Sequence, residues 1–362
     1  MLMEYILEKL TVEHYPHIEP QKCLQLNLSS NKCTKCKDTC SKAAIKLESD
    51  AISFNKNLCN SCGICRAACP TQAINMGGLG EENILRTIKD KDNIIFSCSK
   101  KGGKGTLKLT CLHAFHPELL AALFIMHEDK LFYFNTSRCK NCEIVMDNSS
   151  LFFESLTKAE SFVKSIGINP KYEIIFDEEN LNNLSEKSIS RRDLFSLFRK
   201  ESSNVATNVV DTIVSDKDSY LSIRKILLDG IQGKSDLPKH NLIGNKSLLR
   251  TWNINNSCNG CGNCKTTCPY EAWKIEKKEG KLNIYHNAGK CYQCGKCVTK
   301  CSQNAIEEGN LAVGDLYIYS LKKQVLLTKC CSCSKDFMPI NDEKQCPICD
   351  KKEALRNKLA SI

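Results

Sequence analysis

Residues 258–306 read CNGCGNCKTTCPYEAWKIEKKEGKLNIYHNAGKCYQCGKCVTKCSQNAI, and this stretch carries eight of the 25 cysteines in the chain. Each of its two runs has the spacing C-x2-C-x2-C-x3-C. The first three thiolates of a run can reach three irons of one cube-shaped cluster, and we expect the fourth cysteine, at the start of a helix, to reach the neighbouring cluster. The paired runs therefore predict two iron–sulfur clusters, with a connecting hairpin that turns at Glu279-Gly280.

A third run with the full spacing and a shorter fourth run lie in residues 33–74, which read CTKCKDTCSKAAIKLESDAISFNKNLCNSCGICRAACPTQAI. Here too a short hairpin, Ile45–Leu47 with Ile52–Phe54, is predicted to join the two cysteine loops. The chain therefore contains two copies of one unit, at residues 21–78 and 251–312.

The paired runs and their connecting hairpins resemble the dicluster bacterial-type ferredoxin family in both units. The resemblance implies ferredoxin-like folds, four [4Fe–4S] clusters, and ligand sets that combine the two runs of a unit. In the second unit these sets are Cys258, Cys261, Cys264 and Cys301 for one cluster, and Cys268, Cys291, Cys294 and Cys297 for the other. In the first unit, one cluster is implied at Cys40, Cys59, Cys62 and Cys65.

The remaining cluster of the first unit departs from the pattern, because Ser30 stands where its run should begin. Cys23 lies seven residues upstream of Ser30 and can supply the missing thiolate if residues 24–30 loop back. The alternatives are a three-iron cluster and a cluster that Ser30 ligates. We assign this cluster to Cys23, Cys33, Cys36 and Cys69.

Between the two units, residues 81–180 alternate short apolar runs such as IIFSCS and KLFYFN with helical stretches such as HPELLAALFIMHED. The alternation predicts a small α/β domain with a parallel sheet. Cysteines follow the predicted strands, and ligands of open α/β sheets gather at the carboxyl ends of the strands. We therefore expect one site at Cys98, Cys111, Cys139 and Cys142.

This middle segment resembles the small iron–sulfur (delta) subunit of the methyl-viologen-reducing hydrogenases. The matching features are Thr110-Cys111-Leu112, the following Pro117-Glu118-Leu119-Leu120, and a strand that ends at Cys139. The resemblance implies a [2Fe–2S] cluster and electron transfer to a flavoprotein partner. That family has further cysteines which this chain lacks, so four buried thiols and a zinc site stay open as alternatives.

Two other segments complete the domain organisation. Residues 181–250 are polar and predict a helical connector, with one helix at 188–200 that Ser190 caps. Residues 313–362 carry two C-x2-C pairs separated by twelve residues, which predict a zinc-ribbon-like or rubredoxin-like knuckle. We expect zinc rather than a single iron at Cys330, Cys333, Cys346 and Cys349, with Cys331 as a free thiol or an exchanging ligand.

The predicted fold class is α+β and multidomain: two ferredoxin-like dicluster units flank the small α/β domain, and the knuckle follows. The domains are expected at 1–80, 81–180, 181–250, 251–312 and 313–362. No apolar run approaches the roughly 18 to 20 residues that span a bilayer, and the start, MLMEYILEKL, offers no signal-peptide core. Because cluster assembly needs reduced thiolates, we expect the protein in the cytoplasm.

The formal net charge is +10, from 51 basic and 41 acidic residues. A [4Fe–4S] cluster with four thiolates carries about −2, so four clusters bring the charge to about +2. Two further four-cysteine metal sites would bring it to about −2. The basic excess then mostly compensates anionic clusters, and nucleic-acid binding is not expected.

The sequence contains no radical-SAM run, no Walker loop and no dinucleotide-binding glycine motif. A cube with four thiolate-ligated irons has no open position for a substrate, so we expect no catalytic residues. We predict an electron-transfer protein that passes single electrons through four [4Fe–4S] clusters between redox partners. The alternatives are an electron-transfer subunit of a formate dehydrogenase, hydrogenase or heterodisulfide-reductase-like complex, with a flavoprotein, molybdoenzyme or hydrogenase-type partner; a cluster-assembly factor; and a nucleic-acid-associated iron–sulfur protein.

Overall fold

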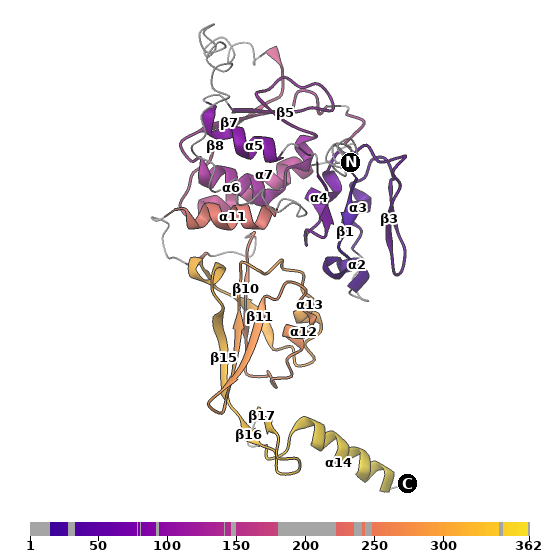
Figure 1. The fold of residues 1–362 in the computed structure, drawn as a ribbon, viewed down its shortest axis with the longest axis vertical. Helices are drawn as coiled ribbons and strands as arrows, with labels where there is room; N and C mark the ends of the chain where they lie inside the picture. Colours follow the sequence, from indigo (N-terminus) through magenta and orange to yellow (C-terminus); the bar gives the residue numbers. More distant parts are fainter. Residues whose placement is uncertain are drawn as a thin grey trace, which may run out of the picture. The chain divides into compact units, whose positions relative to one another are not determined.

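The computed structural model describes residues 15–27, 33–77, 79, 81–91, 94–140, 142–145, 150–179, 222–234, 241–242, 248–339 and 343–360. The chain forms two compact units, Met1–Pro238 and Lys239–Ile362 (Figure 1). The helix predicted at 188–200 lies outside the described residues.

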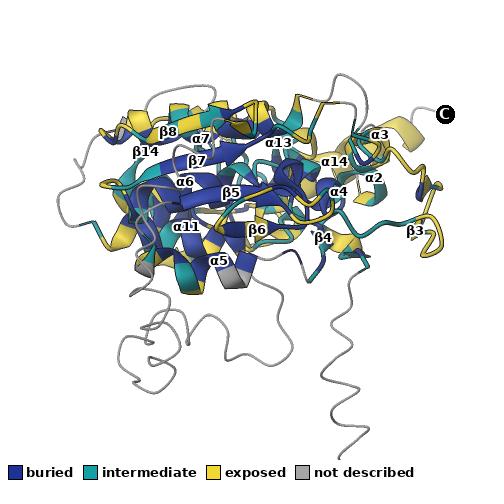
Figure 2. Cartoon of the chain, turned by 90° about the horizontal axis from the view of Figure 1, so that it is seen from above, coloured by how far each residue is buried: buried dark blue, intermediate teal, exposed yellow. Residues whose placement is uncertain are grey.

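A four-stranded parallel sheet forms the centre of the first unit, as the sequence predicts. The strands run in the order β6 (Leu107–Leu109), β5 (Ile94–Cys98), β7 (Leu131–Asn135), β8 (Lys171–Ile175). All of β5 and the last four residues of β7 are buried, and Figure 2 shows both strands in the colour of buried residues. Strands covered on both faces lose the alternation of apolar and polar residues, and β5 and β7 show none.

The helix α6 (Pro117–Met126) contacts both α7 (Leu151–Ser165) and α11 (Ile223–Gln232). Its residues from Glu118 to Ile125 are all buried. A helix that is packed on several sides is apolar all round, so the single apolar stripe read from the sequence describes only part of its buried surface. The other helical segments near the sheet are α5 (Glu81–Thr87), η2 (Ile88–Asp90) and η3 (Leu112–Ala114).

Aromatic side chains fill the core beside the sheet. The ring of Phe96 in β5 stacks on Phe134 and meets Phe115 edge-on, with ring centroids 5.2 Å apart in both pairs. Phe124 of α6 meets Phe132 at 5.5 Å. Each of these five side chains is at most 1% exposed. This core contains no cysteine ligand, so we expect it to be stable without bound metal.

The N-terminal cysteine runs lie in a segment of short elements. β1 pairs with β4 and β2 with β3, both antiparallel, and the β2–β3 hairpin lies where the sequence predicts it. The elements are β1 (His17–Ile18), η1 (Pro20–Lys22), α2 (Leu24–Asn27), α3 (Lys35–Asp38), β2 (Ile45–Leu47), β3 (Ile52–Phe54), α4 (Ile64–Ala68) and β4 (Ile74–Asn75).

The second unit is built on the predicted hairpin of β11 (Trp273–Lys278) and β12 (Lys281–His286). Its two turn residues, Glu279 and Gly280, have φ of +52° and +71°, as a type I′ turn requires. A third strand, β15 (Ser320–Leu326), pairs with β12. The sequence did not predict this strand, because the residues that pair lie some forty positions apart.

Further short elements surround this sheet. β10 pairs with β13, and β9 pairs with β14. The elements are β9 (Asn241–Leu242), β10 (Thr251–Ile254), α12 (Asn263–Thr267), α13 (Lys296–Thr299), β13 (Ile306–Gly309), β14 (Leu311–Ala312) and η4 (Val313–Leu316).

The chain ends in a small hairpin and a helix. β16 (Thr328–Lys329) pairs with β17 (Asp336–Phe337), and α14 (Pro347–Ala360) follows. Residues 350–360 of α14 are all exposed. Within the described ranges, no helix combines the length and the apolar character needed to cross a membrane.

Candidate iron–sulfur and metal sites

One backbone arrangement recurs at the last cysteine of each of the four runs. The N–H of the alanine four positions later donates a hydrogen bond to that cysteine's Sγ. The donor–acceptor pairs are Ala44 to Cys40 (3.4 Å), Ala73 to Cys69 (3.3 Å), Ala272 to Cys268 (3.4 Å) and Ala305 to Cys301 (3.3 Å). An N–H that points at sulfur stabilises the thiolate form, which is the form that binds iron.

The residue before each alanine has left-handed backbone geometry, which turns the alanine N–H toward the sulfur. These residues are Ala43 (φ +48°), Gln72 (+48°), Glu271 (+52°) and Asn304 (+48°). Such a conformation costs free energy in a residue other than glycine. Its repetition at equivalent positions indicates that all four loops are shaped for one purpose.

The second cysteine of three runs is followed by a glycine with positive φ. Gly63, Gly262 and Gly295 have φ of +81°, +81° and +72°, and they precede α4, α12 and α13. These helices end before the fourth cysteine of their runs, so the expectation that this cysteine starts a helix was wrong. The first run departs again, since Thr34 precedes α3 with a φ of −118°.

The first unit contains a cavity of about 420 Å³, counting space open to solvent, beside the β2–β3 hairpin. All four thiols of one predicted set line it: Cys40, Cys59, Cys62 and Cys65. Burial raises the pKa of Cys65, and repulsion from the thiols of this set and from Cys36 raises it further. The thiols of the set thus surround one space and repel one another when ionised.

The second unit holds an equivalent cavity of about 370 Å³. It is lined by all four members of another predicted set: Cys258, Cys261, Cys264 and Cys301. Burial and the neighbouring thiols Cys258 and Cys261 raise the pKa of Cys264 to about 12. Ile254, Ile284 and Ile306 form apolar walls of the cavity.

The other set of the second unit also gathers in one place. Burial raises the pKa of Cys297 to about 12, opposed by a hydrogen bond from Trp273. The negative charges of Cys291, Cys294 and Cys268 raise the pKa further, which places these thiols around Cys297. Cys291 and Cys297 are 8% and 7% exposed, whereas Cys261 of the neighbouring set is exposed.

The structure brings Cys23 to the irregular first run. Burial raises the pKa of Cys36 to about 12, and the charges of Cys69, Cys23 and Cys33 add to the rise. Backbone N–H groups of residues 25 and 26 donate to the Cys23 sulfur, as α2 begins directly after it. Ser30 lies outside the described residues.

These environments fit iron–sulfur clusters. Four thiolates in one buried space are unfavourable by themselves, because burial and mutual repulsion both raise their pKa values. Bound iron supplies the positive charge that such a site lacks, and the N–H donors that point at sulfur remain useful after it binds. The donor set of each group consists of thiols, the ligands that [4Fe–4S] clusters take.

Comparison with protein families supports this interpretation directly. Residues 257–306 match the family described as 4Fe-4S dicluster domain, and residues 52–75 match the 4Fe-4S binding domain. The chain carries two iron–sulfur domains of the ferredoxin type. The second match covers only the regular run of the first unit, which agrees with the altered backbone at residues 33–40. No curated protein matches the chain in a sequence comparison.

The four cysteines of the middle segment converge at the carboxyl ends of the parallel strands. Cys98 is the last residue of β5, and Cys111 lies two residues beyond β6. A hydrogen bond joins Cys98 to Cys111, lowering the pKa of Cys98 and raising that of Cys111. Burial raises the pKa of Cys139 to about 11, with further contributions from Cys98 and Cys142. These four thiols therefore lie within electrostatic reach of one another.

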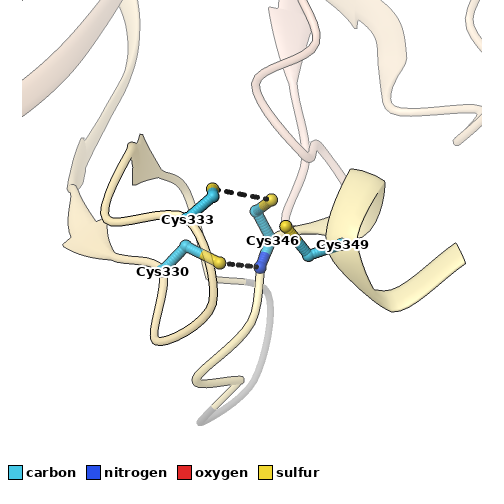
Figure 3. Close-up of side chains that lie close together, drawn as sticks. All are labelled: Cys330, Cys333, Cys346 and Cys349. Carbon is cyan, nitrogen blue, oxygen red and sulfur yellow. Dashed lines mark hydrogen bonds between the residues drawn. The ribbon is translucent and has the colours of Figure 1, made fainter. Parts of the chain in front are cut away.

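The C-terminal cysteines are gathered more tightly. The Sγ atoms of Cys330, Cys333, Cys346 and Cys349 all lie within 4.8 Å of one another (Figure 3). The Cys346 N–H donates to the Cys330 Sγ at 3.2 Å, and the Sγ atoms of Cys333 and Cys346 are 3.9 Å apart. Four thiols at this spacing can hold one tetrahedral metal ion. Among the described residues, no other group of three or more cysteine, histidine or carboxylate ligands is this compact.

Proposed function

We propose that the protein transfers single electrons between redox partners through four [4Fe–4S] clusters. The ligand sets are the four groups of cysteines described above, with Cys23 completing the irregular one. The strongest support is that the hydrogen bond from an alanine N–H to sulfur recurs at all four runs, in a chain that matches two iron–sulfur domain families. A cluster with only thiolate ligands gains or loses one electron and offers no position to a substrate.

The middle cysteines are proposed to hold a fifth centre, a [2Fe–2S] cluster. Their Sγ atoms are not gathered as closely as those of the C-terminal group, which argues against a single zinc ion. Their position at the ends of β5 and β6 supports one shared site. The resemblance to the delta subunit of the methyl-viologen-reducing hydrogenases favours a flavoprotein partner.

A second candidate is an electron-transfer subunit of a larger oxidoreductase. The surface of α14 favours it, since Ile348, Leu355 and Leu359 lie on one face of the helix and are 61–68% exposed. Anaerobic purification tests this candidate. We expect a flavin- or molybdenum-containing partner to co-purify with the natural chain and to be lost with Leu355→Glu; a natural chain that stays alone and exchanges electrons with free ferredoxin would exclude it.

Coulometric titration of the anaerobically purified protein tests the main proposal. The four cubes are expected to take up about four electrons per chain, and the middle centre about one more. Each step should proceed without an organic substrate and should reverse on oxidation. A protein that takes up no electrons, or that requires an organic compound for turnover, would contradict the proposal.

We propose zinc at the C-terminal site and expect Cys346→Ser to lose about one zinc per chain. The iron content should not change, because this site is separate from the cubane ligand sets. Cys331→Ser is the matched control, since Cys331 is exposed and lies outside the compact group. Elemental analysis of both variants gives the answer; retention of zinc in Cys346→Ser or loss of iron would refute the assignment.

Trp273→Phe is expected to make one cluster harder to reduce. The Trp273 side chain donates a hydrogen bond to the Cys297 sulfur, and such bonds stabilise the more negative reduced state. Its loss should lower one reduction potential by some tens of millivolts and leave the others in place. Voltammetry measures the change, with Trp252→Phe as the matched control. An unchanged potential in Trp273→Phe would show that this hydrogen bond has no role in tuning.

A further inference from the structure

The first unit places α4, from the N-terminal ferredoxin-type domain, against η3, from the α/β domain. Each segment lies beside a ligand of a different proposed site, since Cys62 precedes α4 and Cys111 precedes η3. Ile64, Cys111, Ala114 and Ile144 form one buried apolar cluster, and Cys62 and Cys142 pack against it. Thiols of the two sites therefore border the same apolar cluster.

Two specific contacts fix this arrangement. The Ser41 hydroxyl donates to the Ile144 carbonyl at 2.9 Å, and the neighbours of these residues, Cys40 and Cys142, belong to the two sites. Gly63 is packed so closely that an added Cβ would lie 3.1 Å from the Ala114 Cβ. The same Cβ would lie 2.6 Å from the Leu79 side chain, so glycine lets α4 approach η3.

The electrostatics agree with this proximity. The pKa of Cys111 is raised first by its hydrogen bond with Cys98, then by burial, and also by the negative charge of Cys62. On the opposite side, the charge of Cys36 contributes to the raised pKa of Cys65. The thiols of the cavity beside the β2–β3 hairpin thus lie near two other cysteine groups.

These contacts give the three groups of the first unit an order. The set Cys40, Cys59, Cys62 and Cys65 lies between the set containing Cys23 and the middle site. The wall toward the middle site is dry, since Ile64, Ala114 and Ile144 are 3%, 1% and 8% exposed. A short apolar contact between two redox sites favours electron exchange, because little water has to reorient around the transferred charge.

We propose that the α4–η3 contact is a direct electron path from the ferredoxin-type domain into the α/β domain. One electron leaves the site that Cys62 ligates and one electron enters the site that Cys111 ligates, with no proton, bond change or further reactant. The α/β domain is then the exit of the N-terminal half toward a partner. This inference depends on the proposed function, since it requires redox-active iron at both sites.

The test is the spin relaxation of the middle centre in the anaerobic holoprotein. Samples poised at graded potentials are frozen and examined by pulsed EPR. We expect the middle-centre signal to relax several-fold faster once the adjoining cube is reduced. Cys59→Ser should abolish this acceleration, because it damages the adjoining cube at a ligand outside the shared apolar cluster. Cys33→Ser, which damages the more distant cube, should preserve it.

Relaxation that is independent of the redox state of the adjoining cube would overturn the inference, as would zinc or no metal at the middle site. The natural chain decides the question even if Cys59→Ser does not fold. Coulometry separates this failure from failure of the proposed function. A protein that takes up four electrons but shows no coupling loses only the α4–η3 path, whereas one that takes up none loses both.

Discussion

Removal of iron is expected to unfold the two ferredoxin-type domains while the parallel sheet stays folded. The buried core beside the cysteine sets is small and partly made of cysteines themselves, as the cluster of Cys23, Cys69, Ala73 and Ile74 shows. Metal binding then supplies much of the folding free energy. The sheet instead packs fully buried phenylalanines, among them Phe96, Phe134 and Phe152.

Hydrogen exchange followed by mass spectrometry, under anaerobic conditions and before and after iron chelation, measures this difference. Residues 33–75 and 255–306 should lose most of their protection, whereas β5 and β7 should keep it. The two strands are the internal control within the same molecule. Equal protection of the cysteine loops with and without iron would contradict a structural role for the clusters.

Arg224→Met is expected to destabilise the packing of α11 on α6 by about 3–5 kcal/mol. Arg224 and Glu118 form a buried ion pair with an N–O distance of 2.7 Å, and their side chains are 5% and 6% exposed. Burial alone would raise the pKa of Glu118, but Arg224, with His116 and Gln72, holds it below its ordinary value. Without Arg224, the carboxylate stays buried and loses its main partner.

The pH dependence has a definite sign. Because the pKa of folded Glu118 is lowered, its pairing contributes stability above the ordinary carboxyl pKa and loses it as the pH falls through the folded value. The difference between Arg224→Met and the natural chain should therefore be largest near neutral pH and shrink in acid. Glu118→Leu with Arg224→Met should recover much of the loss, because no buried charge remains.

Hydrogen exchange at α6 and α11 measures the change in opening free energy. Arg138→Met is the matched control, since the Arg138–Glu178 pair lies on the surface, where Arg138 is 55% exposed. We expect no measurable change there. A similar loss in both single variants, or no loss in Arg224→Met, would show that the buried pair has no special role.

The parts of the fold that could be predicted are those that short-range patterns determine. Cysteine spacing indicated the repeated loops, turn residues at 279–280 indicated a hairpin, and unbroken apolar runs indicated β5 and β7. The structure also brings Cys23 to Cys36 and Cys69, with the short helix α2 in the segment expected to loop back.

The parts that could not be predicted depend on contacts between residues far apart in the chain. Glu118 and Arg224 are 106 positions apart, and Ser41 and Ile144 are 103 apart. No local periodicity encodes such pairs. The same reason applies to β15, whose pairing with β12 depends on the path of the intervening chain.

The most direct test of the central claim is the content of iron, sulfide and zinc per chain after anaerobic purification, with low-temperature EPR of the reduced protein. The account predicts about 18 irons, with nearly equal sulfide, and about one zinc. About 16 irons would remove the middle cluster and leave the four cubes. About 12 irons or fewer, or a colourless protein that stays folded, would contradict the claim that the four cysteine sets hold [4Fe–4S] clusters.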